Sequence, residues 1–175
     1  KTEKITVDKD NQNFEVKNDA LLTKDGKVLI TFFGNEEIYQ IPDTVETIMD
    51  GAFCGCNTLK DIIIPESVTE IRNGAFENCG NLTDIILPSK LKNIANYVFY
   101  NCSKLTNVNV PDGLESIDYD TFTGCPNLVR TEKIRSLYNN LYEYMGGFNN
   151  YINRPYLMNG GTSMSYYSNS KFAAD

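Results

Sequence analysis

The residues most able to do chemistry in this chain are its five cysteines, four of which lie at one repeating position. Cys56, Cys79, Cys102 and Cys125 follow one another at intervals of 23 residues, and Cys54 lies outside this series. Thiols can form disulfides, bind zinc or pack as small apolar side chains. Each of the four lies between a phenylalanine and a leucine, so we expect buried, unpaired thiols. We expect Cys54 to be the more exposed and the most reactive cysteine.

Two other roles for the four repeated thiols follow from the same spacing. Stacked strands lie about 4.7–4.9 Å apart, which is within the Cα separation that a disulfide allows, so bonds between neighbouring repeats are the first alternative. Parallel side chains that all point inward disfavour the dihedral angle of roughly 90° that a disulfide requires. Zinc binding is the second alternative. Tetrahedral ligation needs sulfur atoms that converge on one point, whereas the equivalent thiols of stacked repeats lie in a straight column. We therefore expect five free thiols, no metal site and no cofactor.

Acid–base chemistry has little support in the sequence. The chain contains no histidine, which excludes every mechanism and metal site that depends on imidazole. Asp118 and Asp120 form one close carboxylate pair, but their spacing indicates a polar turn. Asp8, Asp10 and Gln12 have the first spacings of a calcium loop, but the glycine and glutamate that complete an EF-hand are absent. We predict that the protein is not an enzyme.

Length and charge restrict the class of protein further. The 175 residues suit one domain or one compact array, and 41% of them are hydrophobic, which is typical of a folded chain. With 23 acidic and 16 basic side chains the net charge is −7, which argues against nucleic-acid binding because that requires a basic face. No apolar run approaches the roughly 18 residues that cross a bilayer, so we expect no transmembrane segment.

A repeat of 23 residues organises the middle of the chain. Four units follow without insertion over residues 41–63, 64–86, 87–109 and 110–132. Each unit has a proline near its start, followed by spaced aliphatic, phenylalanine, cysteine and leucine positions. The phenylalanine position holds Phe53, Phe76, Phe99 and Phe122, and the last aliphatic position holds Ile62, Ile85 and Val108.

A unit of this size is too small to enclose a core, so its neighbours must cover its apolar side. Stacking then places equivalent residues above one another, and each repeated position becomes an apolar column along the array. The alternation around Ile62, Ile85 and Val108 predicts strands with one inward face, each ended by a proline. We expect weaker pairing at residues 45–48 and their copies. We also expect a tight helical turn at Phe-x-x-Cys-x-x-Leu.

The repeated unit resembles the BspA-type leucine-rich repeat, a family found on surface proteins of anaerobic bacteria and some protozoan parasites. The resemblance rests on the pattern G-A-F-x-x-C-x-x-L-x-x-I-x-I-P-x-x-V-x-x-I, which is clearest over residues 64–82 and extends over residues 41–130. It implies a right-handed leucine-rich-repeat solenoid, mainly β with short helical turns, and a parallel sheet on its concave face. It also implies a bacterial protein that is secreted or displayed on the cell surface.

The two ends of the chain differ from the repeats. In residues 1–40, strand-like segments at 21–22 and 28–33 flank a Lys-Asp-Gly turn and predict a β-hairpin in an N-terminal variant repeat. In residues 131–175, helical spacing begins after Thr131, a suitable N-cap, and ends before Gly146-Gly147. Its apolar residues are Ile134, Leu137, Leu141 and Met145. We expect this helix to cap the open end of the last repeat, before a tail rich in tyrosine and asparagine that is either packed or disordered.

The candidate binding surface consists of residues that alternate with the inward strand positions and therefore point outward. Ile63 and Ile86 are large aliphatic residues at neighbouring positions that are expected to face solvent. Adjacent exposed apolar side chains indicate an interface. Asp61 and Asp84 would make the same surface acidic. The full candidate set is Asp61, Ile63, Asp84, Ile86, Asn107 and Asn109.

We predict that this surface binds a protein partner, because solenoids offer extended surfaces that suit macromolecules better than small ligands. The family resemblance implies adhesion to host matrix proteins such as fibronectin or fibrinogen, or to neighbouring cells. The alternative is a structural spacer, an accessory array within a larger surface protein or secreted enzyme. In that case the outward residues are only solvated strand positions.

Overall fold

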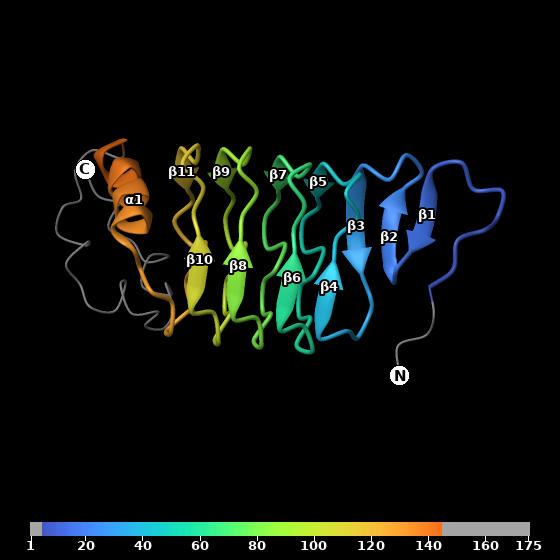
Figure 1. Cartoon of the computed structure of the whole chain (residues 1–175), viewed down its shortest axis with the longest axis horizontal. Coiled ribbons are helices and arrows are strands. Elements are labelled where there is room, and N and C mark those ends of the chain that lie inside the picture. Colours follow the sequence, from blue (N-terminus) through green and yellow to red (C-terminus); the bar gives the residue numbers. More distant parts are fainter. Residues whose placement is uncertain (1–4, 145–175) are drawn as a thin grey trace, which may run out of the picture.

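A computed structural model describes residues 5–144, with the surroundings of individual side chains described as far as Tyr138. Over these residues the chain winds as a stack of coils along one long axis (Figure 1). Two rows of short strands follow this axis, and a helix lies at the C-terminal end of the described part. The predictions for Met145, for the stop at Gly146-Gly147 and for the tyrosine- and asparagine-rich tail fall outside the described residues.

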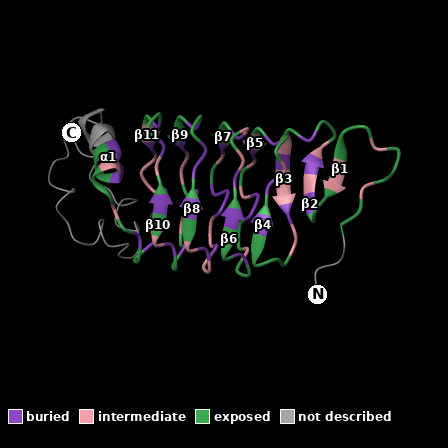
Figure 2. Cartoon of the chain, viewed as in Figure 1, coloured by how far each residue is buried: buried purple, intermediate pink, exposed green. Residues whose placement is uncertain are grey.

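The first row of strands consists of β4 (Ile38–Gln40), β6 (Asp61–Ile63), β8 (Asp84–Ile86) and β10 (Asn107–Asn109). β4 pairs with β6 and β8 with β10, in parallel and between residues 23 positions apart, as for Asp84 and Asn107. In every strand of this row the middle residue is buried and the two outer residues are exposed (Figure 2). The predicted period and alternation are therefore confirmed.

The second row consists of two-residue strands, β5 (Thr47–Ile48), β7 (Glu70–Ile71), β9 (Asn93–Ile94) and β11 (Ser116–Ile117). β5 pairs in parallel with β7, and β9 with β11. The isoleucine of each strand is buried. The weaker pairing predicted for residues 45–48 and their copies is confirmed.

An antiparallel meander forms the N-terminal end of the second row. It consists of β1 (Phe14–Lys17), β2 (Ala20–Thr23) and β3 (Val28–Phe32), and β3 also pairs in parallel with β5. The predicted hairpin of β2 and β3 is confirmed, whereas β1 was not expected. Asn18 and Asp19 join β1 to β2 with φ of 49° and 54°, and two positive φ values are typical of the tight type I′ hairpin turn.

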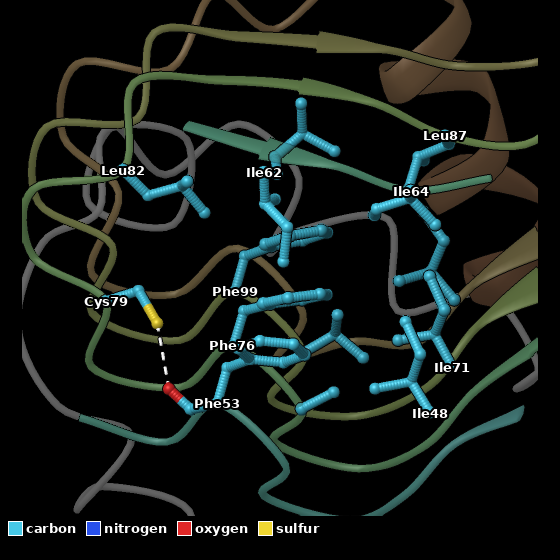
Figure 3. Close-up of a cluster of buried hydrophobic side chains, with 14 of the residues drawn as sticks. Ile48, Phe53, Ile62, Ile64, Ile71, Phe76, Cys79, Leu82, Leu87 and Phe99 are labelled. Carbon is cyan, nitrogen blue, oxygen red and sulfur yellow. Dashed lines mark hydrogen bonds between the residues drawn. The ribbon is translucent and has the colours of Figure 1, made fainter. Parts of the chain in front are cut away.

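The phenylalanine position forms a stack of rings through the middle of the array (Figure 3). From Phe53 through Phe76 and Phe99 to Phe122, successive ring centroids lie 5.1, 5.5 and 5.5 Å apart, with interplanar angles of 19°, 5° and 6°. All four side chains are fully buried. Phe32 extends the stack, with its ring centroid 5.2 Å from that of Phe53. Phe32 belongs to the predicted hairpin segment 28–33, and its place in this column was not expected.

The segment from each phenylalanine to the following leucine forms consecutive β-turns, and the expected helical turns are not present in the described coils. The Phe76 carbonyl accepts the Cys79 N–H at 3.2 Å, and the Cys79 carbonyl accepts the Leu82 N–H at 3.1 Å. The residue before each cysteine interrupts the helical path, because its φ is positive and a right-handed helix cannot pass through it. These residues are Gly55 (74°), Asn78 (59°), Asn101 (57°) and Gly124 (79°).

Helix α1 (Glu132–Tyr144) begins where the sequence predicts it. The Thr131 side-chain oxygen accepts the Ile134 N–H at 3.3 Å, which confirms Thr131 as the N-cap. Ile134 and Leu137 are buried, and the helix packs against β11 at the end of the stack. The side chain of Leu141 lies outside the description. Within residues 5–144, no helix combines the length and apolar character that crossing a membrane requires.

Candidate binding surface

The outward side of the first strand row carries every residue that the sequence predicts for binding. We call this surface the strand face, and it consists of the two outer residues of β4, β6, β8 and β10. All eight are exposed and form two columns along the stack. The first column is Ile38, Asp61, Asp84 and Asn107; the second is Gln40, Ile63, Ile86 and Asn109.

Large aliphatic side chains are exposed on the strand face to an unusual degree. Ile63 and Ile86 are 49% and 69% exposed, and Ile38 on β4 is 61% exposed. Val129, which is 59% exposed, lies beside the asparagine-bearing β10, where its N–H donates to the Thr106 carbonyl at 2.8 Å. Sequence reasoning missed Ile38, although it lies one period before Asp61 and pairs with it.

Two of the polar residues of the strand face, Asp61 and Asp84, are acidic. The Asn107 amide donates to the Asp84 carboxylate at 2.7 Å. This hydrogen bond, with a second from Thr83, holds the pKa of Asp84 below its usual range, so Asp84 is ionised at neutral pH. Beside the face, the Lys60 ammonium lies 2.7 Å from the Glu37 carboxylate. Both partners of this pair are more than half exposed, so the pair adds little to stability.

Three of the four repeated cysteines are packed in the interior, as the sequence predicts. Cys79, Cys102 and Cys125 are buried, and all five cysteines are free thiols. Each buried thiol donates to the phenylalanine carbonyl of the preceding coil, at 3.1, 3.2 and 2.9 Å respectively, and the bond from Cys79 to Phe53 is drawn in Figure 3. Burial raises the pKa of Cys79 to about 12, that of Cys125 to about 11 and also that of Cys102. These thiols are therefore neutral, and Cys56 differs from them in being only half-buried.

The two carboxylate motifs singled out in the sequence lie in turns. The Asp120 carboxylate accepts the Thr123 hydroxyl at 3.2 Å, and the Asp8 carboxylate accepts the Asp10 N–H at 2.8 Å. Among residues 5–144, no three cysteine or acidic side chains are grouped so that they could hold a metal ion.

Solved structures of leucine-rich repeat proteins resemble this chain. One from Bacteroides capillosus is 22% identical with a TM-score of 0.58, and the alignment covers 66% of this chain and 94% of that one, which shows a shared fold. Proteins from Bacteroides ovatus and Eubacterium ventriosum are 30% and 24% identical, with TM-scores of 0.47 and 0.48 over 52% and 75% of this chain. The chain spans only 24% and 49% of their lengths. No curated protein is significantly similar to it.

The sequence profile of the BspA type leucine-rich repeat region matches residues 32–151 in six copies. The match begins at Phe32, the first ring of the phenylalanine stack, and covers more than half of the chain. The chain therefore belongs to the BspA-type leucine-rich repeat family and folds as a β-solenoid of stacked coils.

Proposed function

We propose that this protein is a non-catalytic binding module, displayed on the cell surface or secreted, and that its strand face contacts a protein partner. One observation carries the proposal: Ile38, Ile63 and Ile86 remain exposed on successive strands whose middle residues are buried. Covering apolar surface contributes about 25 cal/mol per Å², so three exposed isoleucines on successive strands supply a driving force for association. The protein itself gains nothing from leaving these side chains in water.

Charge narrows the kind of partner. Asp61 and Asp84 lie in the column beside Ile63 and Ile86, and the whole chain has a net charge of −7. A partner with an apolar strip flanked by lysine or arginine would be complementary, and such complementarity raises association rates and selects partners. We take the strand face as the concave side of a right-handed solenoid, as the family resemblance implies. The same resemblance supports host matrix proteins such as fibronectin or fibrinogen, or neighbouring cells, as targets.

Binding to immobilised fibronectin and fibrinogen tests this proposal. The test variant combines Ile63→Lys with Ile86→Lys, and the control combines Thr69→Lys with Asn93→Lys, which adds the same charge at exposed positions in or beside the second strand row. We expect the unmodified protein and the control to bind at least one of the two ligands equally. We expect the test variant to bind at least about tenfold more weakly, a loss of about 1.4 kcal/mol. Absent binding, or equal binding by all three proteins, would overturn the proposal.

The 23-residue register between paired strands supports a second candidate, a spacer that holds another domain at a distance. A spacer needs only the inward columns, because neighbouring coils alone stabilise one another in a linear array. It predicts the same melting temperature for the three proteins and no saturable binding by any of them. The binding experiment therefore separates the two functions.

A further inference from the structure

One turn of the array carries two thiols that the proposed function does not use. Cys54 occupies the position that Glu77, Tyr100 and Thr123 hold in later coils, so only this coil has the sequence Cys-Gly-Cys. The Cys56 N–H donates to the Phe53 carbonyl at 3.1 Å and closes a β-turn. Cys54 and Gly55 are the central residues of that turn, and Cys56 is its last residue.

The turn places the Cα atoms of the two cysteines within the separation that disulfides allow. Consecutive Cα atoms are ~3.8 Å apart, so residues on either side of a bent glycine lie within about 7 Å of one another. That separation overlaps the range found for disulfides. Gly55 has a φ of 74°, and a Cβ added there would meet no atom within 4 Å, so the tip of the turn faces open space. Cys54 is exposed beside it.

Cys56 lacks the bond that fixes the other thiols of its column. Cys79 donates to the carbonyl of Phe53 at 3.1 Å, and the equivalent acceptor for Cys56 is the carbonyl of Phe32, one coil earlier. Among the described residues Cys56 makes no such bond, and its side chain is half-buried. The physical reason is that residues 34–37 leave the repeat pattern on their way to β4, so no matching turn covers Cys56 from the N-terminal side.

We propose that Cys54 and Cys56 form a redox-sensitive dithiol whose co-substrate is a low-molecular-weight disulfide. In the first step the Cys54 thiolate attacks the small disulfide, forms a mixed disulfide and releases one thiol. In the second step Cys56 attacks the Cys54 sulfur and releases the second thiol. One protein dithiol is oxidised to a disulfide while one small disulfide is reduced to two thiols, and each cysteine proton is transferred to a released thiolate.

The order of the two steps follows from the surroundings of each thiol. Burial raises the pKa of Cys56 to about 11, and the neighbouring Cys54 thiol acts in the same direction. Cys56 is therefore mostly protonated at neutral pH and acts as the slower, resolving thiol. Cys79, on the next coil, is fully buried and hydrogen-bonded, so it does not compete.

Oxidised glutathione added to the reduced, folded full chain tests this inference. Trypsin releases residues 28–60 as one peptide that contains Cys54 and Cys56 and no other cysteine, so mass spectrometry reads this pair directly. We expect this peptide to gain a glutathione adduct and then to release it as glutathione, which leaves the peptide two hydrogen atoms lighter than its reduced form. Because buried thiols react only when the coil opens locally, we expect the peptides with Cys79, Cys102 or Cys125 to react at least about a hundredfold more slowly.

Two variants assign the roles within the pair. Cys56→Ser should stop at a stable glutathione adduct on Cys54, and Cys54→Ser should leave the peptide largely unmodified. A thermal melt of each variant, expected to match that of the unmodified protein, shows that the coil remains folded. The inference is overturned if Cys54 reacts no faster than Cys79, if its adduct never resolves in the unmodified protein, or if Cys54 pairs with a cysteine other than Cys56.

Discussion

The rings of Phe76 and Phe99 lie 5.5 Å apart with their planes within 5° of parallel. They are 23 residues apart in the sequence and belong to neighbouring coils. Such close alignment requires that every coil repeats the backbone path of the one before it. The phenylalanine stack is therefore a sensitive measure of how well the coils are held in register.

Phe76→Ala should lower the free energy of unfolding by roughly 3–5 kcal/mol, the range for removing a large buried aromatic side chain. Phe76 is fully buried and stacks on Phe53 and Phe99, so its loss leaves a cavity between two coils. Urea denaturation measures the effect. Phe14→Ala, at a half-exposed position on β1, is the matched control and should cost far less. Equal losses for the two variants would mean that the phenylalanine stack is not the core.

Gly74→Ala should destabilise the protein by about 1–2 kcal/mol, the cost of placing a side chain in the left-handed region. Gly74 has a φ of 62°, one period after Gly51 with a φ of 63°. Gly113→Ala is the control, because its φ is outside the left-handed region and an added Cβ would make only ordinary contacts. We expect that variant to change the melting temperature little. The reverse order of the two melting temperatures would contradict the repeated left-handed position.

The buried thiols should make the protein less stable in alkali. The pKa of Cys79 is about 12 in the folded state, whereas an unperturbed thiol has a pKa of about 8.5. Between these values the unfolded chain has released the proton that the folded chain keeps. The free energy of unfolding therefore falls by up to about 1.4 kcal/mol per pH unit from this thiol, and its contribution is complete only below about pH 8.5.

Cys79→Ala removes this contribution. Urea denaturation of both proteins at pH 7, 8, 9 and 10, with reductant present, should show the stability advantage of the unmodified protein shrinking above about pH 8.5. Other titrating groups cancel in the difference between the two proteins. Parallel pH profiles would show that the Cys79 thiol is not buried as described.

Thr131→Ala should lower the free energy of unfolding by about 1 kcal/mol, because the Ile134 N–H loses its acceptor at the start of α1. Thr131→Ser keeps the hydroxyl and should lose at most a few tenths of a kcal/mol. Comparison of the two midpoints in urea tests the cap. If both variants unfold at the same urea concentration, the hydroxyl does not hold the helix to the array.

The sequence predicts the inward or outward placement of a residue well where the same type of side chain recurs at the same position of each coil. Ile62, Ile85 and Val108 all proved to be inward strand residues, because burial on one face selects aliphatics at the same place in each coil. The outward residues of β6, β8 and β10 follow directly from that alternation. Ile38 was not predicted as a residue of the strand face, because β4 belongs to a coil that departs from the repeated pattern on its N-terminal side.

The turns were harder to predict, because their geometry is set by backbone dihedral angles that several residue types share. Gly55 and Asn78 occupy the same left-handed position with φ of 74° and 59°, and the spacing of phenylalanine and cysteine alone is equally compatible with a helical turn. The hydrogen bond from the Cys79 thiol to the Phe53 carbonyl could not be predicted either, because a thiol that only packs and a thiol that also donates a hydrogen bond have the same sequence pattern.

The central claim is that the inward residues of each coil stabilise the stack, whereas its outward residues are available to bind a partner. Ile85 and Ile86 test this claim most directly. They are neighbours in β8, yet Ile85 is 2% exposed and Ile86 is 69% exposed. Urea denaturation of Ile85→Ala should show a loss of about 2–5 kcal/mol, whereas Ile86→Ala, the same chemical change one residue on, should stay within about 0.5 kcal/mol of the unmodified protein. Similar losses for both variants would contradict the account.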